Sequence, residues 1–418
     1  MEKLIISGGV RLEGVVTISG AKNAILPILA ASILNSSPVF LEGVPRLDDV
    51  KTMKEVLEAL GAKVKWEGDL MEIDPTTVCS TEVPPELMRR MRASNLVMGS
   101  LLGRYGRVRV SYPGGCTIGS RPMDLHIKGF VALGARVWEK HGFIEAEAPC
   151  LLQGTEIHLD FPSVGATENI MMAAVLARGT TVIRNAAREP EIVDLQNFLN
   201  KMGARIKGAG LDTIRIDGVS TLGREVFYRV IPDRIETGTF MVAAALTRGE
   251  VLIRNTIPRH VEPVAAKLRE AGVKIQEKDD AISVTGVESW NALDIRTFPF
   301  PGFPTDMQPQ MMVFLSLAKG TSIITENIFE NRFQHVGELR RMGAQIHVEG
   351  RSAIIKGVPY LTGTAVEATD LRAGAALVLG GLAAENTTIV EGLHHLDRGY
   401  ERFEEKLRLL GAKIAREK

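Results

Sequence analysis

The feature that most constrains this fold is a segment that recurs six times along the 418-residue chain. Each copy reads as the end of a helix, a glycine and a β-prone tail, as in LEALGAKVKW and LREAGVKIQE. The six glycines are Gly61, Gly134, Gly203, Gly272, Gly343 and Gly411, separated by 73, 69, 69, 71 and 68 residues. A repeat of about 70 residues is longer than the roughly 20 to 50 residues usual in solenoids. The chain is therefore predicted to contain six copies of one larger structural unit.

The residues before each glycine predict the order of elements within a unit. A helix of small residues is followed by a strand rich in Val, Ile and Thr, then a loop, then an amphipathic helix with apolar residues at i, i+3, i+4 and i+7. The glycine closes that helix as a left-handed C-cap, where a side chain would clash. A further strand begins after it. Each unit reads as αβαβ with an added strand, so the fold class is α/β.

Six units in 418 residues suggest two domains with three units each. The segment LIISGGVRLEGVVTISG carries strands without a helix of its own, and we expect it to complete the last unit. Pro232 interrupts a strand-like run before the fourth unit begins. The expected domains are residues 22–231, and residues 1–21 together with 232–418.

Composition excludes several classes of function. Lys plus Arg and Asp plus Glu are 50 each, so no net charge draws the chain to nucleic acid or to a membrane surface. No stretch reaches the roughly 18 apolar residues of a membrane span, and no signal-peptide pattern stands at the start. The three cysteines lack C-x-x-C spacing, which argues against a disulfide framework or a zinc site. We expect a cytoplasmic protein with reduced thiols.

One cysteine stands out from the other two. Cys116 lies in the glycine-rich stretch YPGGCTIGSRPMDLHI, five residues before Arg121. Glycines let a ligand approach the backbone, and a thiol near a guanidinium can have a lowered pKa. The alternative, a small buried hydrophobe, describes most free cysteines. That alternative suits Cys79 and Cys150 better, whereas Cys116 is predicted to be reactive.

Two further stretches place polar groups at the starts of helices. Lys22 and Asn23, in SGAKNAILP, precede an apolar helix, where backbone N–H groups favour anions. An anion site and a solvated helix start remain equally open for this pair. Asp306 follows the proline-rich run FPFPGFPT. It is predicted to be the N-cap of the next helix, a functional carboxylate, or both.

Four arginines lie beside an acid or an amide near the end of an element. They are Arg234, Arg332, Arg372 and Arg398. Any one alone is most simply a structural ion pair, but four at equivalent places in the repeats suggest an inter-domain cleft lined with cations. The chain contains no Walker loop, Rossmann fingerprint, metal cluster or serine triad. The residues thus predict an anion-handling enzyme with an acid and a base in a cleft between two domains.

These stretches together resemble a known family. SGAKNAILP, PGGCTIGSRPMDLH, FPSVGATEN, NAAREPEIVDL, PDRIETGTF, FPTDMQ, ENRFQHV, ATDLRAGAALVL and DRGYE are similar to the UDP-N-acetylglucosamine 1-carboxyvinyltransferases. These enolpyruvyl transferases open bacterial peptidoglycan synthesis, and the resemblance runs essentially from end to end. The related enolpyruvylshikimate-phosphate synthases share the six-unit plan but lack the cysteine loop.

The resemblance implies a fold and a reaction. The fold would be two inside-out α/β barrels, each of three βαβαββ units with helices inside and sheets outside, and the active site would lie between them. The reaction would transfer enolpyruvyl from phosphoenolpyruvate to the 3-hydroxyl of UDP-N-acetylglucosamine by addition–elimination, releasing phosphate. No cofactor and no metal are implied, since protein cations do that work. The alternatives are transfer to shikimate 3-phosphate and a catalytically silent relative that only binds the nucleotide sugar.

The resemblance also implies roles for individual residues. Cys116 would donate a proton to C3 of phosphoenolpyruvate, and Asp306 would be the base for the hydroxyl or its positioning partner. Lys22 and Arg398 complete the expected catalytic set. The expected substrate-binding residues are Lys22, Asn23, Arg92, Arg121, Pro122, Met123, Asp124, Leu125, Ser163, Val164, Gly165, Asp306, Ile328, Arg372 and Arg398. Asp370 would orient neighbouring groups, and Phe161 stands where some members carry lysine, which puts one uridine-phosphate contact in doubt.

Overall fold

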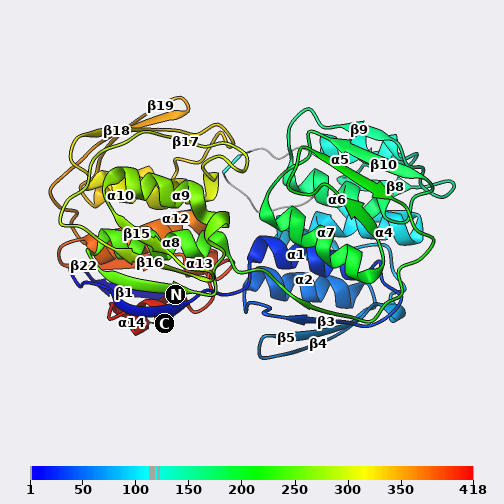
Figure 1. Ribbon diagram of the computed structural model, residues 1–418, viewed down its shortest axis with the longest axis horizontal. Helices are drawn as coiled ribbons and strands as arrows, with labels where there is room; N and C mark the ends of the chain where they lie inside the picture. Colours follow the sequence, from blue (N-terminus) through cyan, green and yellow to red (C-terminus); the bar gives the residue numbers. More distant parts are fainter. Residues whose placement is uncertain (1, 113–117, 120–122, 418) are drawn as a thin grey trace. The chain divides into compact units, whose positions relative to one another are not determined.

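A computed structural model of the protein describes residues 2–112, 118–119 and 123–417. They form two compact units (Figure 1). The N-terminal unit consists of residues 20–112 and 123–231, and the C-terminal unit of residues 2–19, 118–119 and 232–417. Each unit encloses a hydrophobic core of its own. The chain passes from one unit to the other after Ser19 and again after Ile231.

Three sheets with the same strand arrangement form the outside of the C-terminal unit. In one of them β14 (Glu250–Arg254) lies between β2 (Glu13–Thr17), its parallel neighbour, and β16 (Ala281–Thr285), its antiparallel neighbour. The edge strand β15 (Lys274–Glu277) pairs antiparallel with β16. The order is therefore β15-β16-β14-β2. A central strand followed by an antiparallel pair recurs in the other sheets, and all but one of them also have the parallel strand.

The two remaining sheets of this unit repeat that order. Their strands are β17 (Ile295–Arg296), β18 (Thr321–Thr325), β20 (Ser352–Lys356) and β19 (Gln345–Glu349), and β21 (Ala365–Glu367), β22 (Thr387–Glu391), β1 (Lys3–Ser7) and β23 (Lys413–Glu417). In the last sheet the N-terminal strand β1 pairs antiparallel with both β22 and β23. It occupies the place that β16 and β20 have in the other two.

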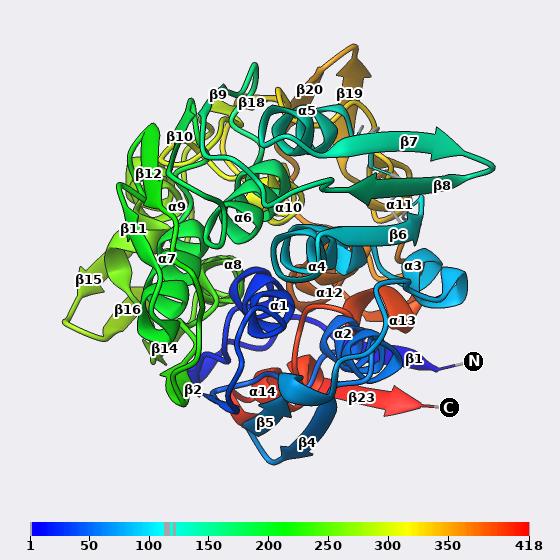
Figure 2. The same cartoon turned by 90° about the vertical axis from the view of Figure 1, so that its right-hand side faces the viewer.

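The N-terminal unit has three corresponding sheets (Figure 2). They contain β9 (Glu156–His158), β10 (Thr180–Arg184), β12 (Thr213–Asp217) and β11 (Arg205–Lys207); β13 (Val226–Arg229), β3 (Val39–Glu42), β5 (Leu70–Asp74) and β4 (Lys63–Glu67); and β6 (Arg107–Ser111), β8 (Phe143–Glu147) and β7 (Arg136–Lys140). The third sheet has three strands, because a single bridge from Glu82 to Arg109 replaces its parallel strand. The prediction of six α/β units is confirmed.

Helices fill the centre of each unit and the sheets face outward. In the C-terminal unit α8 (Arg234–Leu246), α10 (Gln308–Ser316) and α12 (Leu371–Ala383) are buried along almost their whole length. The inner helices of the N-terminal unit are α1 (Lys22–Ser32), α4 (Val97–Tyr105) and α6 (Val164–Ala174). The strands bury alternate residues only, as in β14. This is the inside-out arrangement.

Amphipathic helices form the second helical layer, and each ends at or next to a repeat glycine. They are α2 (Asp48–Ala59), α5 (Asp124–Ala132), α7 (Pro190–Met202), α9 (Pro258–Ala271), α11 (Val336–Arg341) and α14 (Phe403–Leu409). All six glycines have φ between +93° and +115°. Backbone in that region disfavours residues with a Cβ. The predicted left-handed C-cap is confirmed for α7 and α9, whose C-caps are Gly203 and Gly272. In the other four units the residue before the glycine is the C-cap, and the left-handed glycine directly follows it.

Candidate active site

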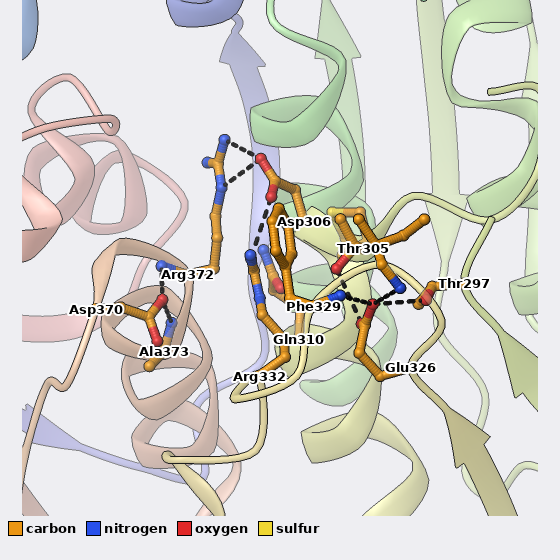
Figure 3. Close-up of polar contacts among 12 residues, drawn as sticks. Thr297, Thr305, Asp306, Gln310, Glu326, Phe329, Arg332, Asp370, Arg372 and Ala373 are labelled. Carbon is orange, nitrogen blue, oxygen red and sulfur yellow. Dashed lines mark hydrogen bonds and ion pairs between the residues drawn. The ribbon is translucent and has the colours of Figure 1, made fainter. Parts of the chain in front are cut away.

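Asp306 lies where two buried arginines converge (Figure 3). It belongs to the 3-10 turn η3 (Thr305–Met307), directly before α10. Its Oδ1 accepts a hydrogen bond from Arg332 Nη2 at 3.1 Å, and its Oδ2 accepts from Arg372 Nε at 3.2 Å and Nη2 at 3.0 Å. The prediction that Asp306 is a helix N-cap is wrong. The carboxylate turns to the two guanidinium groups, and the residues at the cap positions are Pro304 and Met307.

The two guanidinium groups are more deeply buried than the carboxylate that they share. Arg332 and Arg372 are 2% and 3% exposed, whereas the Asp306 side chain is 27% exposed. Arg332 Nε and Arg372 Nη1 are buried and have no hydrogen-bond partner within the described part of the chain. Burial alone would lower the pKa of Arg372, but nearby negative charge, chiefly that of Asp306, outweighs it and raises the pKa. Two buried cations share one carboxylate, which suits the binding of a further anion.

The start of α12 fixes the position of Arg372. Asp370 caps this helix, accepting hydrogen bonds from the backbone N–H groups of Arg372 at 2.9 Å and Ala373 at 3.1 Å. The guanidinium carbon of Arg372 lies 5.4 Å from the centre of the Tyr400 ring. The Tyr400 hydroxyl in turn lies 2.9 Å from Thr239 Oγ1 in α8. Arg372 is thus held by a capped backbone and a buried aromatic ring.

The other two arginines of the predicted group lie elsewhere in the same unit. Arg234 is the first residue of α8, and its guanidinium carbon lies 5.6 Å from the centre of the Phe300 ring. Arg398 follows α13 (Leu393–Leu396) and is half-buried. Arg332 and Arg372, two of the four arginines, thus meet at one carboxylate.

In the N-terminal unit Lys22 forms a buried ion pair. Lys22 and Asn23 are the first two residues of α1, and Asn23 is half-buried. Lys22 Nζ lies 2.6 Å from Asp49 Oδ2, in the first turn of α2. The two side chains are 11% and 4% exposed. Sequence reasoning missed Asp49, whose only signal is a pair of acids at a helix start.

The residues expected to hold the nucleotide sugar begin a third inner helix. Ser163 caps α6, its Oγ accepting the N–H of Ala166 at 3.3 Å, and Val164 and Gly165 form the first turn. A Cβ on Gly165 would come within 3.2 Å of the His126 ring, so the two pack closely. Phe161 lies just before this helix and is 45% exposed.

A second part of the expected sugar site begins α5. Met123 is buried with its sulfur 3.3 Å from Asn95 Nδ2, Asp124 is exposed, and Leu125 is half-buried. Ile118 groups with the C-terminal unit, where its carbonyl accepts the backbone N–H of Asn331 at 2.9 Å. Outside the described residues lie Cys116, Arg121, Pro122 and the side chain of Arg92.

The expectation that Cys79 and Cys150 are buried is wrong. Both are exposed. Cys79 follows the 3-10 turn η1 (Pro75–Thr77), and Cys150 lies in the connection between β8 and β9. Connections run over the surface because their backbone groups need water or local partners.

Sequence reasoning also missed a group of buried carboxylates in the N-terminal unit. Glu168 lies within α6, and Glu189 and Glu191 lie at the start of α7. Burial raises the pKa of Glu168 well above its usual value, and the charges of Glu191 and Glu189 add to this effect. The one available signal was an acid inside an otherwise apolar helix.

Two other kinds of site find no support among the described residues. Within residues 2–112, 118–119 and 123–417, no helix combines the length and apolar character needed to cross a membrane. Over the same ranges, no three or more His, Cys, Asp or Glu side chains gather in a way that could hold a metal ion.

Sequence comparisons identify relatives over the full chain. The family model of EPSP synthase (3-phosphoshikimate 1-carboxyvinyltransferase) matches residues 6–407. UDP-N-acetylglucosamine 1-carboxyvinyltransferase 2 of Carboxydothermus hydrogenoformans is 60% identical over 418 residues, covering 100% of this chain and 99% of that protein. UDP-N-acetylglucosamine 1-carboxyvinyltransferase 1 of Caldanaerobacter subterraneus subsp. tengcongensis is 59% identical, covering 99% of each.

Solved structures agree with this assignment. The enolpyruvyl transferase NikO from Streptomyces tendae superposes with a TM-score of 0.89 at 27% identity, covering 99% of this chain and 98% of that one. An EPSP synthase from Acinetobacter baumannii shares the fold, with a TM-score of 0.76 at 17% identity and full coverage of both chains. The six-unit fold, the Asp306 cluster and these relatives together place the chain in the UDP-N-acetylglucosamine 1-carboxyvinyltransferase family of enolpyruvyl transferases.

Proposed function

We propose that this protein transfers the enolpyruvyl group of phosphoenolpyruvate to the 3-hydroxyl of UDP-N-acetylglucosamine, releasing phosphate, as the first committed step of peptidoglycan biosynthesis. The structural observation that carries the proposal is the meeting of Arg332 and Arg372 at Asp306. A carboxylate able to take a proton thus lies beside cations able to bind an anion. The names of the relatives supply the nucleotide-sugar acceptor.

Addition followed by elimination needs these groups. The sugar hydroxyl oxygen bonds to C2 of phosphoenolpyruvate while its proton leaves, and C3 gains a proton. A proton then leaves C3, the bond from C2 to the phosphate oxygen breaks, and phosphate departs. Asp306 accepts the hydroxyl proton or orients the hydroxyl, and Cys116 donates the proton to C3 and can itself bond to C2. Arg372, with Arg332, stabilises the negative charge of the phosphoenolpyruvate.

The proposal assigns its other contacts to residues of both units. Lys22, with Arg121 and Arg398, binds the phosphate, and Arg92 assists with the anions. The ion pair with Asp49 gives the buried Lys22 ammonium a partner before substrate binds. The nucleotide sugar lies against the starts of α1, α5 and α6 and against Ile328. Both substrates are charged, water-soluble metabolites, so we place the reaction in the cytoplasm.

Phosphate release distinguishes this function from its alternatives. The protein is supplied with phosphoenolpyruvate and, in separate reactions, with UDP-N-acetylglucosamine, shikimate 3-phosphate or no acceptor. We expect phosphate release when UDP-N-acetylglucosamine is the acceptor, and none with shikimate 3-phosphate or without an acceptor. Release with shikimate 3-phosphate would instead support the related synthase activity. Release with neither acceptor, together with measurable nucleotide-sugar binding, would identify a binding protein without turnover.

A further inference from the structure

A buried carboxylate that no sequence motif singled out follows strand β18. It belongs to Glu326, which is 1% exposed. Its Oε1 accepts hydrogen bonds from Thr297 Oγ1 at 2.8 Å and from the backbone N–H groups of Ile328 at 2.8 Å and Phe329 at 3.2 Å. Its Oε2 accepts from Thr305 Oγ1 at 2.9 Å (Figure 3). Four donors thus surround one buried carboxylate.

These donors come from three separate segments. Thr297 follows β17, Thr305 begins the turn η3, and Ile328 and Phe329 begin the loop that leads to α11. Within the described ranges, no lysine, arginine or histidine pairs with Glu326. A buried carboxylate without a cation depends on its hydrogen bonds, and losing one donor is costly. The three segments are therefore held in one arrangement.

Two of these segments carry the groups of the candidate active site. Thr305 directly precedes Asp306, and the loop that starts at Ile328 contains Arg332. The guanidinium carbon of Arg332 lies 5.6 Å from the centre of the Phe329 ring. Glu326 touches neither Asp306 nor Arg332, yet it binds the backbone or side chain of residues next to both. The two segments that bring Asp306 and Arg332 to 3.1 Å are thus both hydrogen-bonded to Glu326.

We infer that Glu326 is a positioning residue, which holds the Asp306 turn and the loop of Ile328 and Arg332 in register for catalysis. The inference rests on the transfer proposed above. A misplacement of about 1 Å can cost a rate on the order of 10²-fold. Loosening these segments therefore acts on turnover through Asp306 and on nucleotide-sugar binding through Ile328.

The test compares Glu326→Gln, Thr305→Val and the double variant. Gln keeps the shape of Glu326 but removes its negative charge, and a neutral amide oxygen accepts more weakly than a carboxylate oxygen, so the bonds to both segments weaken. We expect kcat to fall roughly 10- to 100-fold and KM for UDP-N-acetylglucosamine to rise. Thr305→Val removes only the bond to the Asp306 turn, so kcat should fall while that KM changes little. Because both act on the same turn, the double variant should be no slower than about the slower single variant.

Three controls separate positioning from a general loss of stability. Thr305→Ser keeps the hydroxyl and should restore kcat. Glu349→Gln changes an exposed acid at the end of β19 and should leave kcat, KM and the urea midpoint unchanged. Urea unfolding of each variant reports stability, and if Glu326→Gln does not fold, the Thr305 pair decides alone.

The outcomes separate this inference from the proposed function. If the unaltered protein does not turn over phosphoenolpyruvate with UDP-N-acetylglucosamine, the proposed function is overturned, and with it the role of Glu326 in that function. Turnover that is unchanged in Glu326→Gln and Thr305→Val would overturn the inference and leave the proposed function standing. Losses that simply multiply in the double variant, in step with lower urea midpoints, would reduce Glu326 to a structural residue.

Discussion

The Asp306 carboxylate and the Arg372 guanidinium meet at 3.0 Å although 66 residues separate them in the chain. The repeat explains the separation of 66 residues. Asp306 stands at the start of the inner helix of one unit, and Arg372 stands at the start of the inner helix of the next unit. The negative charge of Asp233, which is the N-cap of the remaining inner helix α8, also raises the pKa of Arg372. The N-terminal ends of α8, α10 and α12 therefore gather at one place.

The N-terminal unit uses the same positions. Lys22 and Asn23 begin α1, and Ser163 caps α6. Helix N-termini present unpaired N–H groups and partial positive charge, which suit phosphates and carboxylates. The repeat thus supplies inner-helix N-termini that suit anions. The side chains at each N-terminus differ, so each can bind a different group of the substrates.

The first prediction concerns Asp306. Asp306→Asn keeps the shape of the side chain but removes the basic oxygen, so kcat should fall by roughly 10²-fold or more. Affinity for UDP-N-acetylglucosamine, measured by calorimetry, should change much less. Asp279→Asn, at an exposed turn before β16, is the matched control and should behave as the unaltered protein. Near-normal turnover of Asp306→Asn would remove the assignment of Asp306 as base.

The second prediction concerns Lys22. Lys22→Met should raise the concentration of phosphoenolpyruvate needed for half-maximal rate, because a hydrogen bond to a charged group contributes about 1.5–3 kcal/mol. Lys65→Met, whose side chain is 76% exposed in the same unit, should have no effect. Lys22→Met also leaves Asp49 without this cation, so Asp49→Asn is added to relieve the loss of stability. If the double variant recovers normal phosphoenolpyruvate dependence, Lys22 acts through folding and not through the substrate.

The third prediction concerns Cys116, which lies outside the described residues and whose role follows from the family. The epoxide fosfomycin, an anion shaped like phosphoenolpyruvate, should alkylate Cys116 faster when UDP-N-acetylglucosamine is present. Iodoacetamide should label the exposed Cys79 and Cys150 whether or not the sugar is bound. Mass spectrometry of the labelled peptides over time measures both reactions, and Cys116→Asp should abolish the first. Fosfomycin on Cys79 or Cys150, or a rate that the sugar leaves unchanged, contradicts the assignment.

The fourth prediction concerns stability and pH. Burial raises the pKa of Asp194 from 3.8 to about 6, although the hydrogen bond from the Tyr228 hydroxyl lowers it in part. Well below pH 3.8 the carboxyl is protonated in both folded and unfolded chains, whereas above pH 6 the folded chain bears the cost of a buried charge. The free energy of unfolding should therefore fall, relative to Asp194→Asn, by roughly 2 kcal/mol as pH rises from 4 to 7.

Urea denaturation of both proteins across that pH range measures the difference. Asp69→Asn, which changes an exposed aspartate of the same unit, serves as the control and should follow the unaltered protein throughout. If the stability of the unaltered protein relative to Asp194→Asn stays constant, or rises as pH rises from 4 to 7, the assignment of this pH dependence to Asp194 is contradicted.

The fifth prediction concerns the repeat glycines. Gly272 has φ of +106°, and a Cβ added there would meet no atom within 4 Å, so Gly272→Ala introduces backbone strain alone. The free energy of unfolding should fall by roughly 1–2 kcal/mol. Gly337→Ala, in α11 with equally open space, should leave stability unchanged or raise it by up to about 1 kcal/mol. Equal effects of the two substitutions would show that the helix end does not require glycine.

Much of the fold follows from local properties of the sequence. The six glycines mark helix ends because a positive φ is a requirement of the residue itself, independent of distant partners. Apart from Arg372, segments such as LRAGAALVLGGLA are apolar on every face, which marks an inner helix because no face of it can meet water. Lys22, Asp306 and Arg372 could be named as site residues because each stands in a motif at a helix start.

Only the tertiary structure decided which charges meet and which side chains are buried. Asp49 pairs with Lys22, Arg332 pairs with Asp306, and Glu326 joins three segments that are separated along the chain. Cys79 is exposed, although burial was predicted because most free cysteines are buried. The periodicity of a segment fixes its own helix or strand, but the partner of a charge depends on which other segment packs beside it. That packing is decided by the whole core, and so the sequence by itself determined the repeating unit while the folded chain determined the site.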